Sequence, residues 1–370
     1  MEYTICHLTT GHSADDVRIF YKECLSLSVV NNYRVIICAP GTIPTGSNVI
    51  HYKISKPPSS RLIRFVNSQL IFIKLIFKIR ADVWHIHDLE LLPIAVLLTY
   101  LKRRVIWDSH EDYYSQFQSK INYRRYIPIY IRPIVRRTVT FLLSQIDQKA
   151  FGIVGPSASV IEKYQNPNAT LIGNGALLND FSSCAPKFEN NIVLFTGQLD
   201  SSHCYREIVD AIANIPELKL VVATRIFNKK EIDYSSQILK HRFQYLGWLG
   251  RENLSDVISN SSIGLVTYSF NLNHQDNQPN KFYEFCAAGL PILATPTLFN
   301  NKLVENSNGG ILASGYDSKS LELALLKLIS SESDWHNYSE SGRNWAKING
   351  DWAVSESSLL KLYSKILQNY

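Results

Sequence analysis

The sequence predicts an α/β protein of two domains, each with a parallel β-sheet covered by helices on both faces. Its 370 residues are about two to three times the usual size of one domain, and 45% of them are apolar, which is enough for two cores. Short β-branched runs alternate with longer helical patterns, and continuous apolar strands are typical of buried parallel sheets. The alternation starts again after Gly173-Asn174-Gly175, the strongest turn cluster in mid-chain.

The individual elements follow from these runs. In the first half, strands are expected at Tyr3–His7, Arg34–Ala39, Val83–His87, Val105–Asp108 and Gly152–Gly155. Helices are expected between them at Arg18–Val30, Leu62–Ile79 and Leu91–Leu101. In the second half, strands are expected at Ile192–Thr196, Leu218–Ala223, Phe243–Leu246, Ile263–Val266 and Pro291–Ala294. The order predicts two facing Rossmann-like domains, residues 1–172 and 173–350, followed by a separate segment, 351–370.

The composition excludes several classes of protein. A chain with 19% charged residues and this apolar content is not disordered as a whole. The six cysteines lie far apart without a CxxC pair, which argues against a disulfide scaffold or a structural zinc site and indicates a cytosolic protein. No basic leader precedes an apolar core at the N-terminus, and Lys74 and Lys78 interrupt the longest apolar stretch. We therefore expect neither a signal peptide nor a membrane span.

Polar loops follow the predicted strands, where parallel sheets bind their ligands. These loops contain Thr9-Thr10-Gly11-His12, His87-Asp88, Asp108-Ser109-His110-Glu111, Thr196-Gly197-Gln198 and the approach to Pro279-Asn280-Lys281. With two facing domains, the site is expected in the cleft between them.

The segment from Asp276 to Pro291 carries the most information. Pro279 and Asn280 suit a helix start, and Gly289 before Pro291 is a strong stop. The free N–H groups of such a helix start favour phosphate, so Lys281 in the first turn suits a bound anion. Glu284, one turn later, can bind the vicinal hydroxyls of a ribose. An ordinary surface helix with a charged first turn is the alternative.

This segment resembles the E-x7-E region of the retaining GT-B-fold glycosyltransferases of family 4 (glycosyl transferases group 1). Asp276 and Glu284 have the spacing of the family's two carboxylates. The resemblance implies that Glu284 contacts the nucleotide ribose. It also implies that Asp276, one methylene shorter than the family's Glu, faces the transferred sugar.

Further blocks resemble the same family along essentially the whole chain. They are residues 12–27, 83–93 and 105–112, together with Asp351-Trp352 and the helix expected at Ser355–Leu367. The resemblance implies that His110 lies near the donor sugar. It also implies that the helix in 351–370 crosses back to the N-terminal domain.

The loop after the first strand of the second domain departs from the family. The family has Gly-Arg there and a second basic residue about five positions later in the chain. These two basic residues bind the donor diphosphate. This chain has Gly197-Gln198, and His203 is cationic only when protonated. Because buried phosphates need compensating charge, the candidate replacements are Lys281, Arg206 and Arg225. Lys281 is favoured because its helix start already points at the anion.

Two other groups allow more than one interpretation. Asp16 precedes a helix and is either an N-cap or a weak candidate base beside the acceptor. His85 and His87 lie on one face of a strand and could bind a metal, but a polar pair at the strand end is favoured because no further ligand spacing accompanies them. The resemblance implies that the transfer needs no metal, and no cofactor is expected.

The net charge of +6 is unevenly distributed. Through Asp180 the chain has 21 Lys and Arg against 13 Asp and Glu, and the remainder has 17 against 19. Residues 61–80 and 113–146 are basic and apolar without any acid, which is typical of a surface that lies on an anionic bilayer. The alternative is that the apolar faces are core and the charges are merely solvated. Nucleic acid is a poorer partner because no known binding module accompanies the charge.

These features together predict a metal-independent hexosyltransferase. We expect it to move a sugar from a UDP- or GDP-sugar to a lipid-linked glycan acceptor in bacterial O-antigen, capsule or exopolysaccharide synthesis. The C-terminal domain would hold the nucleotide and the N-terminal domain the acceptor. The expected location is cytoplasmic, peripheral on the inner face of the plasma membrane. A nucleotide-sugar epimerase of the same fold and a non-catalytic membrane-associated scaffold stay open as alternatives.

Overall fold

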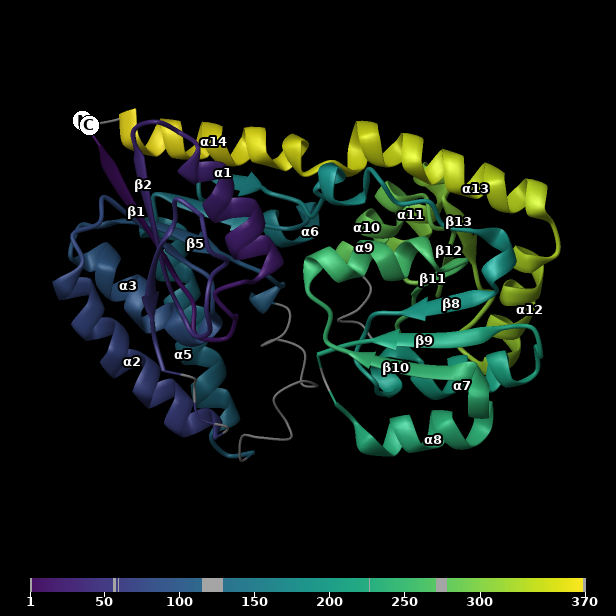
Figure 1. Cartoon of the computed structure of the whole chain (residues 1–370). Coiled ribbons are helices and arrows are strands. Elements are labelled where there is room, and N and C mark those ends of the chain that lie inside the picture. The colour runs from purple at the N-terminus through teal and green to yellow at the C-terminus, as the bar shows by residue number, and fades with distance from the viewer. Residues whose placement is uncertain are drawn as a thin grey trace. The chain divides into compact units, whose positions relative to one another are not determined.

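The computed structural model describes residues 2–55, 58, 60–114, 129–225, 227–270 and 278–368. The chain divides into two compact units, the first made of Met1–Gly173 with Ser355–Tyr370 and the second of Asn174–Val354. Each unit contains one parallel β-sheet flanked by helices (Figure 1). The predicted class, two Rossmann-like α/β units, is confirmed.

The first unit is built on a seven-stranded sheet with the strand order β3-β2-β1-β4-β5-β6-β7. Its strands are β1 (Tyr3–Leu8), β2 (Tyr33–Ala39), β3 (Ile50–Lys53), β4 (Val83–Ile86), β5 (Arg104–Asp108), β6 (Gly152–Gly155) and β7 (Ala169–Leu171). Its helices are α1 (Leu25–Ser28), α2 (Arg61–Lys78), α3 (Leu92–Tyr100), α5 (Arg132–Lys149) and α6 (Ala158–Ile161), with a π-helix at Val17–Cys24 and a 3-10 turn at Leu89–Leu91.

The two faces of this sheet carry different kinds of side chain. Leu8 and Trp84 point into the main core, where they pack with Phe72 of α2 and with residues of α3 and α5. Because side chains alternate along a strand, the neighbouring His7 and His85 face the other side. Helix α14 (Trp352–Gln368) supplies Tyr363 there, and its hydroxyl lies 2.9 Å from His85 Nδ1. The residues of α14 from Ser355 onward therefore belong to the first unit.

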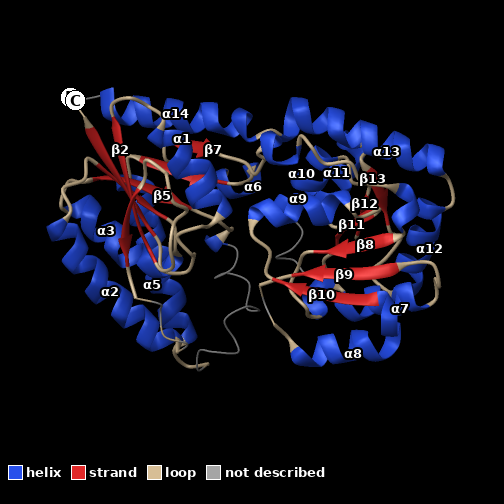
Figure 2. Ribbon diagram, in the orientation of Figure 1, coloured by secondary structure: helices blue, strands red, loops and turns tan. Residues whose placement is uncertain are grey.

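The second unit is built on a six-stranded parallel sheet with the order β10-β9-β8-β11-β12-β13 (Figure 2). Its strands are β8 (Ile192–Phe195), β9 (Lys219–Ala223), β10 (Phe243–Gly247), β11 (Ile263–Val266), β12 (Ile292–Ala294) and β13 (Gly310–Leu312). Its helices are α7 (Tyr205–Ala213), α8 (Lys229–Leu239), α9 (Arg251–Ser259), α10 (Asn280–Ala288), α11 (Leu298–Ser307), α12 (Ser318–Ile329) and α13 (Glu332–Trp345). Short 3-10 turns lie at Leu178–Phe181, Phe188–Asn190, Ser201–His203 and Lys240–Arg242, and a π-helix lies at Ala346–Gly350.

Every strand that the sequence predicts is present to within one residue at each end. The sequence pattern missed the short strands β3, β7 and β13, none of which is longer than four residues. The helix expected at Arg18–Val30 is wrong in its type. It is a π-helix followed by one turn of α-helix, Leu25–Ser28, and a hydrophobic pattern does not distinguish the wider turn.

Candidate functional sites at the switch points of the two sheets

Each sheet has one point where the strand order reverses. It lies between β1 and β4 in the first unit and between β8 and β11 in the second. At such a point the loops leave two neighbouring strands in opposite directions and open a crevice at their carboxyl ends. The predicted site residues fall largely on the loops at these two points.

Helix α10 brings Lys281 to the switch point of the second unit. Pro279, with extended backbone, precedes the helix, and Gly289 ends it in the left-handed conformation at φ 69°. The apolar side of the helix, which includes Phe282 and Phe285, is buried. Lys281 in the first turn is only 8% exposed. The predicted start and stop of this helix are therefore present.

The amine of Lys281 has aromatic neighbours, and the described residues place no counter-charge beside it. Its Nζ lies 5.4 Å from the ring centre of Phe195 at the end of β8 and 5.3 Å from that of Tyr268 beyond β11. Among the residues that the structure describes, none hydrogen-bonds to this nitrogen. Burial lowers the pKa of Lys281 to about 7. A buried amine without a partner among the described residues is ready to accept an anionic ligand.

The loop after β8 runs close to this amine. A Cβ on Gly197 would lie 2.9 Å from Phe195 Cζ and 3.1 Å from His203 Cδ2, so the backbone passes where no side chain fits. The His203 ring lies 5.1 Å from that of Tyr268, and its Nδ1 lies 3.1 Å from Asp200 Oδ1. Close backbone approach and a helix start are the features with which proteins bind phosphate.

Two hydrogen bonds tie the loop after β8 to the loop after β11. Thr267 Oγ1 donates to the His203 carbonyl at 2.9 Å, and the Ser269 amide donates to the Ser202 carbonyl at 2.9 Å. The loop geometry at this switch point is thus fixed by residues from both strands.

The remaining predicted donor-binding residues are placed differently. Arg206 on α7 is exposed and forms an ion pair with Glu231 of α8 at 2.9 Å. The exposed Arg225 places its guanidinium 4.0 Å from the centre of the Trp248 ring. Gln198 is exposed, and Glu284 is half-buried one turn after Lys281. Asp276 lies outside the described residues. The structure thus gathers Gly197, His203 and Lys281.

Asp88 organises the loop after β1 in the first unit. One oxygen, Oδ2, accepts hydrogen bonds from Thr9 Oγ1 (2.7 Å), the Thr10 amide (2.6 Å) and the Gly11 amide (3.0 Å). The other oxygen, Oδ1, lies 3.0 Å from His12 Nδ1. Burial alone would lower the pKa of His12, but the hydrogen bond and charge of Asp88 outweigh it and raise the pKa to about 9. This loop therefore presents an imidazolium held by a carboxylate.

His110, predicted to lie near the donor sugar, stacks on His12. Their ring centres are 4.9 Å apart and the ring planes meet at 25°. Burial lowers the pKa of His110 to about 4, although the nearby Asp108 opposes the shift. His110 is therefore neutral beside a charged His12, and the pair can offer one polar and one cationic group to a ligand.

Asp16, the weak candidate base, has a structural role. Its Oδ1 accepts hydrogen bonds from the amides of Arg18 (2.9 Å) and Ile19 (3.1 Å) at the start of the π-helix. The N-cap interpretation thus accounts for this oxygen.

Sequence reasoning missed the roles of three residues. Asp88 and His12 are far apart in the sequence, and only the pairing of β1 with β4 brings their loops together. Tyr268 follows a predicted strand, which is a signal that could have placed it at the site.

Three solved structures have the two-unit fold of this chain. Sucrose-phosphate synthase from Thermosynechococcus elongatus is 14% identical with a TM-score of 0.75, and 100% of each chain is covered. HepE of Anabaena in complex with UDP is 12% identical with a TM-score of 0.74, over 99% of this chain and 100% of HepE. WaaG, a glycosyltransferase involved in lipopolysaccharide biosynthesis, is 12% identical with a TM-score of 0.73, over 97% of this chain and 99% of WaaG. These similarities show the fold, and the predicted GT-B fold is confirmed.

Residues 180–345 match the family model of glycosyl transferases group 1. The chain therefore contains a glycosyl transferases group 1 domain, and this stretch includes Gly197, His203, Lys281 and Glu284. No curated protein sequence matches the chain.

Proposed function

We propose that the protein is a retaining glycosyltransferase that moves a sugar from a nucleoside-diphosphate sugar to a glycan acceptor. One observation carries the proposal: the buried amine of Lys281, without a hydrogen-bond partner among the described residues, lies at the start of α10. It lies at the sheet's switch point within the matched domain. A diphosphate would supply a counter-charge that the described residues do not place here.

The residues of the second unit would act on the leaving group. As the bond from the sugar to the diphosphate breaks, negative charge grows on the phosphate oxygens. Protonated Lys281 and the amides at the start of α10 would stabilise that charge. Because Gly197 has no side chain, the phosphates could approach the backbone there closely. Glu284 would bind the ribose, as the family resemblance implies.

The donor is proposed to be a UDP- or GDP-sugar. HepE, a neighbour in fold, was solved with UDP, which favours testing uridine first. The roles of His110 and Asp276 toward the sugar follow from the family resemblance and belong to this proposal. No metal is proposed to take part in the transfer.

The acceptor is proposed to be a lipid-linked glycan in surface polysaccharide synthesis, with the protein peripheral on the inner face of the membrane. Helix α2 exposes Phe65, Val66, Leu70 and Phe77, and Lys74 and Lys78 are exposed on the same helix. No helix in the described part of the chain combines the length and apolarity needed to cross a bilayer. Apolar groups beside cations favour binding on an anionic surface.

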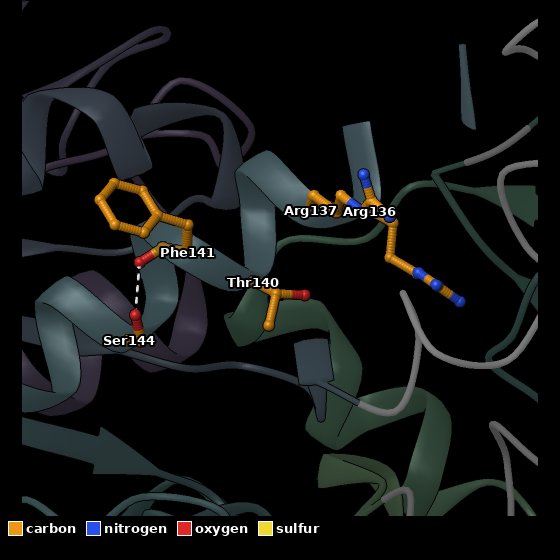
Figure 3. A pocket seen from close by; sticks show the side chains of 5 residues that line it. All are labelled: Arg136, Arg137, Thr140, Phe141 and Ser144. Carbon is orange, nitrogen blue, oxygen red and sulfur yellow. Dashed lines mark hydrogen bonds between the residues drawn. The ribbon is translucent and has the colours of Figure 1, made fainter. Parts of the chain in front are cut away.

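Helix α5 adds a basic hollow to the first unit. A cavity of about 590 Å³ is lined by Arg136, Arg137, Thr140, Phe141 and Ser144 (Figure 3). Arg136 and Arg137 present guanidinium groups, and the Phe141 side chain is 59% exposed. Two guanidinium groups on the same helix as an exposed ring suit an anionic headgroup with its acyl chain.

Thermal unfolding with UDP, GDP, ADP and CMP tests the proposal. A ligand at about 100 times its dissociation constant should stabilise the protein by about 2.7 kcal/mol, a shift of a few degrees. We expect UDP or GDP to raise the midpoint, and a transfer assay on lipid-linked acceptors then follows with that donor class. A midpoint unmoved by all four nucleotides would contradict the proposal and favour the scaffold.

The epimerase alternative separates from the transferase in the same assay. An epimerase converts the nucleotide sugar without any acceptor, whereas the proposed transferase gives product only when the acceptor is added. Conversion that is independent of acceptor would overturn the transferase.

A further inference from the structure

Four buried side chains with metal-ligating groups meet in the first unit. They are His7 on β1, His85 on β4, His87 just after β4, and Glu23 in the π-helix Val17–Cys24. Each is 0% exposed. One ligand atom from each lies within 4.8 Å of the others. We refer to these four residues as the buried histidine cluster.

The fold forces these residues together. His7 and His85 are direct partners in the pairing of β1 with β4. His87 lies two residues after His85 and shares its side of the strand. The π-helix adds Glu23 from above this side of the sheet, where its Oε2 lies 3.8 Å from His85 Nδ1. The HxH pair seen in the sequence thus gains the two further ligands that sequence reasoning did not find.

The hydrogen bonds of the cluster are incomplete. His7 Nδ1 and His87 Nε2 share one at 2.9 Å, and His85 Nδ1 has Tyr363 as partner. Oε2 of Glu23, Nε2 of His7 and Nε2 of His85 have no hydrogen-bond partner in the described structure, whereas Oε1 of Glu23 pairs with Arg18 Nε at 3.3 Å. Three such atoms in one fully buried place are unusual, because buried polar groups are nearly always satisfied.

The two separations measured from Glu23 are within the reach of a cation between the ligands. The Oε2 atom of Glu23 is 3.8 Å from His85 Nδ1 and 4.0 Å from His87 Nε2, too far for hydrogen bonds. Two ligands that each lie about 2.1 Å from zinc are at most about 4.2 Å apart. An ion could therefore bridge these atoms after small shifts, replacing the hydrogen bond between His7 and His87 and the one between His85 Nδ1 and Tyr363.

The surroundings also resemble those of a metal ligand. His87 Nδ1 lies 3.1 Å from Asp108 Oδ2, so a proton on Nδ1 leaves the lone pair of Nε2 facing the cluster. Arg18 Nε lies 3.3 Å from Glu23 Oε1 and 3.4 Å from Asp108 Oδ2. It occupies the far oxygen of Glu23 and leaves Oε2 toward the histidines.

We propose that His7, Glu23, His85 and His87 bind one divalent transition-metal ion, with zinc as the best match. Three imidazoles and one carboxylate are ligands that zinc prefers, and four protein ligands in a buried place make a closed, structural site. The ion would tie β1, β4 and the π-helix together beneath the loops that carry Asp88 and His110. This site is independent of the proposed donor site in the second unit.

The test begins with the whole protein freed of metal by a chelator and then incubated with Zn²⁺. We expect about one Zn²⁺ per chain to survive gel filtration and to raise the unfolding midpoint. Co²⁺ should give the strong visible absorption of a four-coordinate ion, distinct from the weak absorption of six-coordinate surface Co²⁺. A protein that does not retain zinc, or that binds cobalt only in six-coordinate form, would overturn the proposal. A proton on Glu23 or a buried water would then occupy the space between the four side chains.

Two variants and a control assign the site. Loss of a residue that only hydrogen-bonds to a metal ligand lowers metal affinity about 10- to 100-fold. Glu23→Gln and His7→Gln each remove a direct ligand, so they should weaken zinc binding at least that much. His336→Gln is the control, because His336 is an exposed histidine on α13. Full binding by folded Glu23→Gln protein would contradict the assignment. If both variants fail to fold, the Co²⁺ spectrum of the unmodified protein decides.

Discussion

Lys281 Nζ lies 5.3 Å from the ring centre of Tyr268, at the end of a side chain that is almost wholly buried. Lys281→Met keeps the apolar stem and removes the charge. We expect the unfolding shift with UDP or GDP to vanish and the affinity to fall about 10- to 100-fold, because a hydrogen bond to a charged group contributes about 1.5–3 kcal/mol.

The unliganded variant should be as stable as the wild type or more stable. A lysine with a lowered pKa costs folding free energy at neutral pH, on the order of a few kcal/mol, and methionine removes that cost. Lys229→Met is the control, because Lys229 is an exposed lysine of the same unit, paired with Asp233. If UDP or GDP raised the unfolding midpoint equally in wild type and Lys281→Met, the role of Lys281 in binding the diphosphate would be ruled out.

The affinity for nucleoside diphosphate should depend on pH through the same lysine. Burial lowers the pKa of free Lys281 to about 7, and a bound diphosphate raises it, so binding takes up a proton above pH 7. The dissociation constant should therefore rise with pH, by up to about tenfold per unit. Burial raises the pKa of Tyr268, which keeps its hydroxyl protonated over this range. Calorimetry between about pH 7.5 and 9, in buffers of different ionisation enthalpy, measures the proton uptake. A dissociation constant that does not change with pH would contradict the role of Lys281.

Gly197→Ala should disturb both the fold and the donor site. The added Cβ would meet Phe195 Cζ at 2.9 Å, and Phe195 is fully buried, so its ring has little room to move. We expect a loss of about 1–3 kcal/mol in unfolding free energy, the usual cost of overpacking. Nucleotide binding should weaken as well, since the backbone is displaced. Chemical denaturation and nucleotide titration of the variant check the two effects, and a neutral result in both would show that the loop adapts.

Asp88→Asn should destabilise the first unit more than an ordinary surface change. Asp88 accepts four hydrogen bonds and faces His12, and removing one partner of a buried pair costs about 3–5 kcal/mol. Asp82→Asn is a matched control, because Asp82 accepts one backbone hydrogen bond, from Thr4 at 2.8 Å. Loss of this hydrogen bond should lower the free energy of unfolding by only about 1 kcal/mol. Similar midpoints of urea unfolding for the two variants would contradict the importance of the Asp88 network.

Most of this fold was predictable from the sequence because strands of uninterrupted apolar residues dominate both sheets. Val193 and Leu194, for example, are buried on opposite faces of β8, so their pattern has no polar interruption. The edge strand β3 is half-exposed and only four residues long, which leaves too short a pattern to detect. The π-helix that carries Glu23 was expected as an α-helix, because hydrophobic spacing does not report how many residues close a turn.

The candidate donor site was predictable where one local segment encodes it. Pro279, Lys281 and Gly289 lie within one short helix, and its start and stop are local signals. The aromatic surroundings of Lys281, without a counter-charge among the described residues, were not predictable, because Phe195 ends one strand and Tyr268 follows another. The same holds for Asp88, whose partners lie almost eighty residues earlier in the chain.

Binding to anionic vesicles should depend on the basic hollow of α5. Changing Arg136 and Arg137 together to glutamate reverses two positive charges, and each basic residue near such a surface contributes about 1 kcal/mol. We therefore expect sedimentation with phosphatidylglycerol vesicles to fall at least about tenfold. Nucleotide binding should stay unchanged, because the substitutions lie in the other unit. Exchanging the exposed Lys229 and Lys240 of the second unit for glutamate makes the same charge change and serves as control. An equal loss in that control would mean that net charge, not the α5 surface, drives the association.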